Sequence, residues 1–185
     1  MINIVAICGS LRKDSYNKKL LEAIKHESND QWDVTFVEID ELPLFNEDLE
    51  IGGDPEEVSD FKKKLKDADG ILIVTPEYNS GIPGGLKNAL DWASRPVRSS
   101  FFLNLPVALA GATPGSLGTA LSQMQLRQIL VAMNANVLSA PKVLVGEVHK
   151  KIDLETRQVT DHRTLSHLKS FINAFTEFVE MYRKD

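Results

Sequence analysis

Residues 9–17, which read GSLRKDSYN, are the first segment of this chain whose composition suits ligand chemistry. Gly9 permits a sharp turn and a close approach of the backbone to a ligand. Arg12 carries a planar charged group that pairs well with phosphate, and three small side chains add hydrogen-bonding groups. These belong to Ser10, Ser15 and Asn17. A phosphate site explains the segment, and a polar turn in which a serine caps the next helix explains it equally well.

Residues 75–85, which read TPEYNSGIPGG, form a second candidate segment. Its prolines fix the path of the backbone, and its glycines permit tight turns. Tyr78 supplies a flat face, while Glu77 and Asn79 supply hydrogen-bonding groups, and this combination suits a planar heterocycle with polar edges. The alternative is a rigid turn in which Tyr78 only covers the core. Loops this elaborate are disproportionately functional, so we favour the ligand site.

A third segment, residues 111–118, reads GATPGSLG. Its small residues leave room for a flat ring and present backbone N–H groups to it. Taken alone, a plain glycine- and proline-rich turn explains it equally well. None of the three segments contains GxxxxGK[ST] or GxGxxG. Their absence argues against a P-loop NTPase and against a dinucleotide-binding Rossmann site.

Other kinds of catalytic centre find little support in the sequence. There is no GxSxG motif for a nucleophilic serine and no HExxH spacing among the four histidines. The single cysteine, Cys8, forms neither an internal disulfide nor a CxxC pair, and it ends an apolar run. We therefore expect a buried, unreactive thiol and no bound metal.

Composition and charge also restrict the partners. The formal net charge is −5, and acidic and basic residues are mixed along the chain. Short basic clusters such as Lys62–Lys64 alternate with acids and are typical of a solvated helix face, so we expect no nucleic-acid partner. The apolar N-terminal residues 1–8 are too few for a signal peptide, and no apolar run approaches the roughly 18 residues of a membrane span. We therefore expect a cytoplasmic protein without a membrane partner.

Short apolar runs alternate with longer helical patterns along the chain. We expect strands at 2–8, 34–39, 71–75, 105–110 and 137–145, the last interrupted by a proline. Helical patterns follow near 20–24 and 54–57 and over 84–92, 118–134 and 161–182. This alternation predicts an α/β, flavodoxin-like, doubly wound, five-stranded parallel sheet of order 2-1-3-4-5, with helices on both faces. No linker or repeat divides the chain, so residues 1–185 form one domain.

The three segments each follow a predicted strand. In an open parallel sheet, ligands bind beyond the carboxyl ends of the strands, near the point where the strand order reverses. We therefore expect the three segments to converge on one binding site.

Residues 9–17 and 75–92 together resemble the NADPH-dependent FMN reductase family, which includes bacterial quinone, chromate and azo-dye reductases. The resemblance extends over almost the whole chain. It implies a bound FMN cofactor, with NADPH or NADH as co-substrate. It also implies hydride transfer through FMN to small-molecule acceptors: quinones, flavins, azo compounds or metal oxyanions. Assembly as a homodimer or homotetramer, with the flavin near a subunit interface, is implied as well.

The resemblance also assigns roles to individual residues. In the first segment, the FMN phosphate is held by Ser10, Arg12, Ser15 and Asn17, and Tyr16 is also a cofactor-binding residue. The isoalloxazine ring is bordered on one side by Pro76, Glu77, Tyr78 and Asn79, and on the other by Thr113, Gly115 and Ser116. No side chain is assigned a catalytic role, because the chemistry belongs to the flavin.

The third segment departs from the family pattern of two glycines and a following arginine. Here Thr119 follows Gly118, and Leu121 stands in the next turn. The preference for NADPH or NADH and the oligomeric state are therefore the family properties that the resemblance supports least. Two other functions keep the same three loops: a flavodoxin-type electron carrier and an FMN-binding regulatory protein with little turnover. Carriers are usually strongly acidic, and a charge of −5 is mild for that class.

Overall fold

A computed structural model describes residues 1–97, 100–153, 155–156 and 158–183. The strands of this part of the chain are β1 (Ile2–Cys8), β2 (Trp32–Val37), β3 (Gly70–Val74), β4 (Pro106–Ala112), β5 (Asn136–Val137) and β6 (Val143–Val145). Its α-helices are α1 (Tyr16–Ser28), α2 (Glu56–Lys66), α3 (Gly84–Ala93), α4 (Ala120–Ala132) and α5 (His162–Tyr182). The predicted alternation of strands and helices is confirmed.

The strands form one parallel sheet in the order β2-β1-β3-β4-β5, and the predicted doubly wound order is confirmed. In register, Ile4 of β1 lies opposite Val34 of β2 and Gly70 of β3. The chain moves from β1 outward to β2 and then returns to β3 on the other side. The strand order therefore reverses between β1 and β3, where ligands bind in this architecture.

The last predicted strand, at 137–145, forms as two short strands. β5 pairs with the start of β4, and β6 pairs with its end through Ala110 and Val143. Pro141 stands between them, and proline has no N–H to donate to a neighbouring strand. The described residues thus form six strands where the pattern predicts five. Because β5 and β6 both pair with β4, the predicted place of the fifth strand beside β4 is unchanged.

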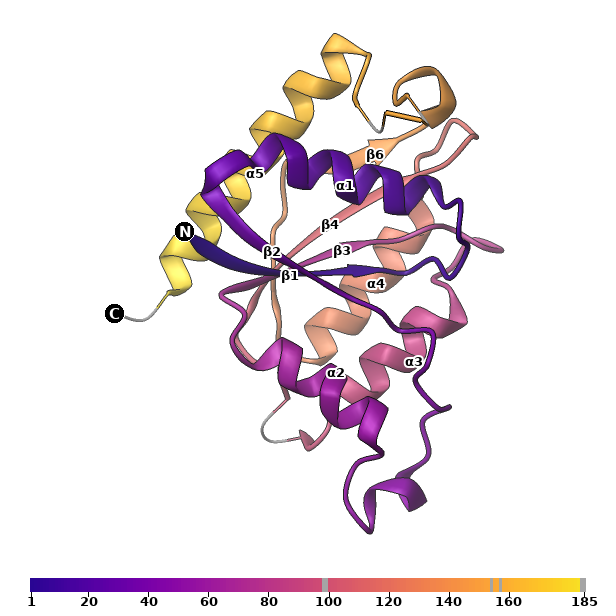
Figure 1. Ribbon diagram of the computed structural model, residues 1–185, viewed down its shortest axis with the longest axis vertical. Helices are drawn as coiled ribbons and strands as arrows, with labels where there is room; N and C mark the ends of the chain where they lie inside the picture. Colours follow the sequence, from indigo (N-terminus) through magenta and orange to yellow (C-terminus); the bar gives the residue numbers. More distant parts are fainter. Residues whose placement is uncertain (98–99, 154, 157, 184–185) are drawn as a thin grey trace.

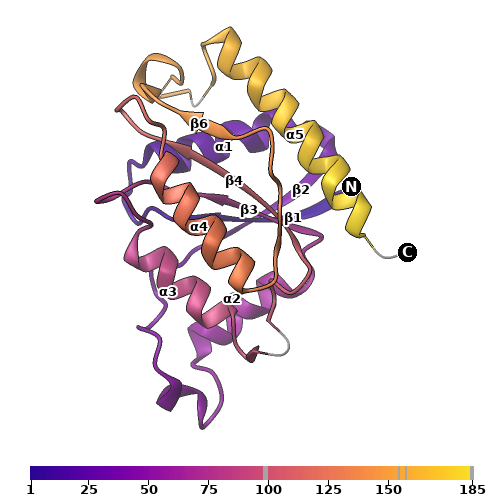
Figure 2. The ribbon, with the colours of Figure 1, turned by 180° about the vertical axis from the view of Figure 1, so that it is seen from behind.

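Helices cover both faces of the sheet. Helices α1 and α5 lie on one face, and α2, α3 and α4 lie on the other (Figures 1 and 2). Each face has its own apolar cluster: Leu20 and Phe171 belong to the first, and Phe61 and Leu126 to the second. β3 is buried along its whole length because it contacts both layers. Within the described ranges, no helix is long and apolar enough to cross a bilayer.

Candidate functional site

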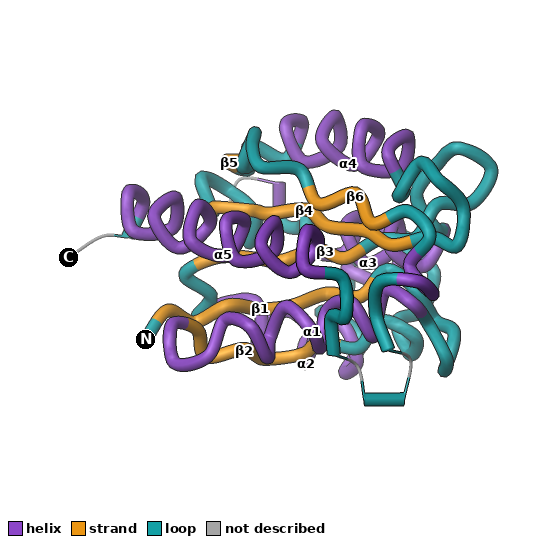
Figure 3. Tube along the Cα trace, turned by 90° about the horizontal axis from the view of Figure 1, so that it is seen from above, coloured by secondary structure: helices purple, strands orange, loops and turns teal. Residues whose placement is uncertain are grey.

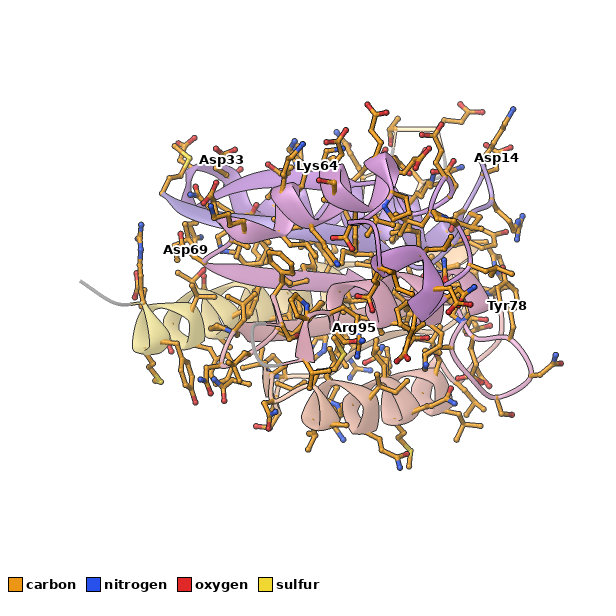
Figure 4. All side chains as sticks on the ribbon, turned by 90° about the horizontal axis from the view of Figure 1, so that it is seen from below. Asp14, Asp33, Lys64, Asp69, Tyr78 and Arg95 are labelled. Carbon is orange, nitrogen blue, oxygen red and sulfur yellow. The ribbon has the colours of Figure 1, made fainter. Side chains whose placement is uncertain are left out.

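The three predicted segments meet at one edge of the sheet. They follow β1, β3 and β4, which are neighbours in the sheet, and parallel neighbours carry their C-terminal loops to the same edge. Figure 3 shows these loops gathered at the end of the sheet opposite the N-terminus. Figure 4 shows Asp14 of the first loop and Tyr78 of the second at that end, with Asp33 and Asp69 at the other. The expected convergence is confirmed in the structure.

The first loop, 9–15, contains buried hydroxyl groups and open backbone donors. Ser15 is the N-cap of α1, and its Oγ accepts hydrogen bonds from the N–H groups of Asn17 (3.1 Å) and Lys18 (3.5 Å). Ser10 is buried as well. In the described part of the chain, no group accepts a hydrogen bond from the N–H of Leu11, Lys13 or Asp14. The loop is thus both a helix cap and a source of free donors.

Arg12 is exposed at the tip of this loop. Within the described ranges, no carboxylate lies within ion-pair distance of its guanidinium. The positive charge is therefore available to an anion that settles on the loop, next to the positive end of the α1 dipole.

Asn17, in the first turn of α1, bonds to the last residue of β4, directly before the third loop. Its buried amide nitrogen donates to the Ala112 carbonyl (3.0 Å), and its Oδ1 accepts the Ala112 N–H (2.8 Å). Two of the side chain's hydrogen-bonding groups are therefore used within the protein. The resemblance gives Asn17 a direct phosphate contact, whereas the structure gives it a link from the start of α1 to the end of β4.

Tyr16 also has a role in the structure that the sequence pattern does not show. It is the first residue of α1, and its half-buried side chain packs against the apolar cluster on the α1 and α5 face of the sheet. Behind the loop, Cys8 is partly buried, and this burial raises the pKa of its thiol. An elevated thiol pKa accords with the unreactive cysteine that we expect.

The second loop contains a two-residue hairpin. Tyr78 donates its N–H to the Gly81 carbonyl (3.1 Å), and Gly81 donates back to Tyr78 (3.0 Å). Asn79 and Ser80 form the turn with φ values of 49° and 63°, a left-handed conformation that is sparsely populated for residues other than glycine. Tyr78 is 49% exposed, so its ring does not serve as core cover. That observation favours the ligand interpretation of this loop over the plain turn.

One of the two carboxylate oxygens of Glu77 is used within the protein. Its Oε2 accepts the N–H groups of Leu121 (2.9 Å) and Ser122 (3.0 Å), in the first turn of α4. The Ser122 hydroxyl in turn donates to the Pro76 carbonyl (2.9 Å). The second loop is thereby attached to the start of α4.

Sequence reasoning did not single out Ser122 or Gln125, although both hold the second loop. Gln125 Oε1 accepts the Ile82 N–H at 2.8 Å. The only sequence signal is that these polar residues stand three apart on one face of a helix. Nothing local in the sequence says which loop that face meets.

The third loop, 113–119, packs tightly at its base and is exposed at its tip. A Cβ atom at Gly111 would lie 2.7 Å from the Thr75 carbonyl oxygen and would collide with the Thr119 hydroxyl, so only glycine fits there. Thr113 donates its N–H to the Val145 carbonyl (3.0 Å). Gly115 and Ser116 are exposed. The structure brings all three predicted residues, Thr113 included, to the same edge as the first two loops.

Comparison with known proteins gives a consistent result. Residues 2–150 match the family model described as NADPH-dependent FMN reductase. A 2-hydroxy-1,4-benzoquinone reductase from a Burkholderia species is 37% identical over 178 residues, 96% of each chain. A quinone reductase from Escherichia coli K12 is 36% identical over 181 residues, 97% of this chain and 96% of that one. The structure of FerB, a flavoenzyme NAD(P)H:(acceptor) oxidoreductase from Paracoccus denitrificans, superposes with a TM-score of 0.92 at 33% identity, covering 98% of this chain and 99% of that one.

The link between Asn17 and Ala112 makes a prediction about stability. Replacing Asn17 by alanine leaves the buried N–H and C=O of Ala112 without partners, and should lower the free energy of unfolding by about 2 kcal/mol in urea titrations. Asn136→Ala is the control, because its side chain makes one exposed hydrogen bond, to the Asn104 carbonyl. Equal losses in the two variants would show that the loop-to-loop link adds no stability.

Proposed function

This chain belongs to the NADPH-dependent FMN reductase family, and on that premise we propose that it reduces small quinones with NAD(P)H, using FMN held at the carboxyl edge of its sheet. The chain is an FMN-dependent NAD(P)H oxidoreductase with a flavodoxin-like fold. The open N–H groups of the first loop, beside a free guanidinium and a helix N-terminus, carry the proposal. The choice of quinones is supported by the names of the relatives, which include quinone reductases.

The donors of the first loop fit a phosphate dianion. Leu11, Lys13 and Asp14 offer free N–H groups, Arg12 offers a charged fork, and the buried Ser10 hydroxyl lies at the base of the loop. These donors converge on one exposed loop without a protein acceptor among the described residues, and one anion can accept several of them at once. We therefore assign the FMN phosphate to this loop, with Ser15 shaping the helix end and Asn17 fixing the neighbouring loop.

The second and third loops fit a planar ring with polar edges. The hairpin leaves the N–H groups of Asn79 and Ser80 without acceptors among the described residues, and it exposes the face of Tyr78. Across the edge, Thr113, Gly115 and Ser116 present small side chains that permit a flat group to approach. We assign the isoalloxazine ring to the space between these loops, with Pro76 and Glu77 supporting the hairpin from beneath.

When bound, FMN supplies the redox chemistry, because it accepts a hydride from a nicotinamide and passes electrons to an acceptor. The chain supplies binding, orientation and fixed dipoles. Backbone N–H groups near the ring edge favour added negative charge there, as they do in other sites that stabilise developing anions. No side chain of the site has to act as a general acid or base. Since the donor is a cytoplasmic nicotinamide, we place the protein in the cytoplasm.

We also infer that the protein assembles as a homodimer or homotetramer. The outer face of α4 carries exposed apolar side chains, with Met124 66% and Val131 64% exposed. A groove of about 410 Å³ between α3 and α4 adds further apolar lining from Leu90, Ile129 and Met133. A row of exposed apolar residues on a helix is typical of an interaction surface, and a second copy of this chain covers it with a matching apolar face.

The assembly can be tested on the α4 face itself. Met124→Glu and Val131→Glu should each shift the mass measured by light scattering toward that of a monomer, because a desolvated carboxylate disfavours the contact. Met181→Glu is the control, since Met181 is 77% exposed on α5, on the other face of the sheet. A monomeric wild-type protein, or equal effects of all three substitutions, would contradict the assignment of this surface.

The proposed function is tested most directly by an absorbance spectrum without oxygen. Protein loaded with FMN should show flavin bands that bleach when NADPH or NADH is added and return when 1,4-benzoquinone follows. Bands that persist with both nicotinamides would favour an electron carrier or a regulatory protein. A protein that takes up no FMN would overturn the proposal.

The phosphate assignment predicts the effect of changing Arg12. Arg12→Ala should raise the FMN dissociation constant about tenfold or more, because a charge-assisted contact to the phosphate is lost. Arg12→Lys should recover part of the affinity, since it keeps the charge but not the planar fork. Arg163→Ala removes an exposed arginine from α5 and should leave the constant unchanged. Fluorescence titration with FMN measures all three, and an unchanged constant in Arg12→Ala would contradict the assignment.

A further inference from the structure

Glu77 takes the place of a missing helix cap on α4. The residue before this helix, Thr119, has a left-handed conformation (φ 67°) and makes no capping hydrogen bond with its side chain. The carboxylate of Glu77, which lies 44 residues earlier in the sequence, accepts the N–H groups of Leu121 and Ser122 instead. Its negative charge also complements the positive end of a 13-residue helix. The cap of α4 is therefore supplied by the loop that borders the site.

The hairpin beyond Glu77 needs an external support. Asn79 and Ser80 both have positive φ values, and neither is glycine. Residues in such conformations persist where the surrounding structure holds them, and they cluster at functional sites. Two contacts provide the support on either side of the turn: Glu77 bonds to the start of α4, and the Ile82 N–H donates to Gln125 Oε1 one turn further along the helix. Both ends of the hairpin are thus attached to α4.

We propose that Glu77 is a positioning residue: through its contact with the first turn of α4, it holds the Tyr78–Gly81 hairpin in the conformation that receives the flavin ring. The inference rests on the proposed function, because it assigns the ring to this hairpin. Glu77 acts here through backbone geometry, and its hydrogen-bonded oxygen serves α4 rather than the ligand. Loss of the contact should loosen the hairpin, weaken FMN binding and slow turnover.

The experiment compares two helix caps of the same chemical kind. Glu77→Ala removes the cap of α4, while Asp161→Ala removes the cap of α5, where the Asp161 carboxylate accepts the Thr164 N–H at 2.7 Å. Both variants should lose a few degrees of melting temperature. Glu77→Gln retains a carbonyl oxygen that accepts the two N–H groups but carries no charge. It therefore separates the hydrogen bonds from the charge.

Three measurements decide the outcome. Hydrogen exchange of the protein without FMN should speed up across the hairpin in Glu77→Ala and not in Asp161→Ala. With FMN, Glu77→Ala should raise the dissociation constant about tenfold and lower kcat for NADPH and 1,4-benzoquinone to a similar degree, with the quinone KM within about twofold. Asp161→Ala should leave the hairpin exchange, the FMN dissociation constant and kcat at wild-type values. Glu77→Gln should restore most of the FMN affinity and turnover that Glu77→Ala loses.

The results separate this inference from the proposed function. If Glu77→Ala and Asp161→Ala share the same exchange, FMN affinity and kcat, Glu77 is an ordinary helix cap and the inference is wrong. If hairpin exchange alone changes while FMN affinity and kcat stay at wild-type values, the hairpin does not position the flavin, and the inference is also wrong. A wild-type protein that takes up no FMN overturns the proposed function and the flavin part of the inference together, while the exchange comparison still reports whether Glu77 holds the loop.

Discussion

Asn17 and Glu77 reach across 95 and 44 residues of sequence to bond with the backbone at the end of β4 and at the start of α4. Parallel strands bring the three loops to one edge, but the strands themselves do not shape them. Loops lack the repeating hydrogen bonds of strands and helices, so buried backbone groups near the edge need other partners. Ala112 receives its partner from Asn17, and the first turn of α4 receives one from Glu77. These contacts tie the start of α1 to the end of β4 and the second loop to the start of α4.

This constraint divides the polar residues of the site into two groups. Asn17 and Glu77 use their hydrogen bonds within the protein, and the cost of leaving their partners unsatisfied keeps the loops in place. Arg12, the N–H groups at the tips of the loops and the face of Tyr78 stay open. An open donor set on a rigid frame binds a ligand without first having to be ordered, and this saves conformational entropy. In the proposed site, the residues that shape the edge of the sheet are thus distinct from the residues that stay open to a ligand.

Much of the fold follows from local sequence patterns. The apolar run at 2–8 and the buried run near 71–74 predict β1 and β3, and the helical patterns between the runs predict the parallel order. Those signals are local, and the few rules that govern connections between parallel strands then restrict the order of the strands in the sheet. The interruption of the last strand at Pro141 was predicted, but its formation as two separate short strands was not, because the pattern does not say how far the proline separates the two halves. The composition of the three loops predicts a site at this edge, and the strand order brings the three loops together there.

The roles of individual site residues were harder to predict, because they depend on distant partners. A serine or asparagine after a strand looks the same whether it binds a ligand, caps a helix or holds another loop. Ser15 proves to be the N-cap of α1, and Asn17 bonds to Ala112. The family resemblance assigns a ligand role by position, whereas the atoms available for that role are fixed only by the folded structure. For Glu77, the deciding partner is the start of α4, which no local pattern connects to it.

Helix α4 connects the two parts of the proposed function. Its first turn binds Glu77, its next turn holds Ile82 through Gln125, and its outer face carries Met124 and Val131. The side chain that holds the proposed flavin hairpin and the exposed apolar side chains of the proposed interface therefore stand on one helix. Leu121 donates its N–H to Glu77 and also exposes 41% of its residue surface. The interface that we propose therefore reaches the same turn of α4 that holds the proposed flavin hairpin.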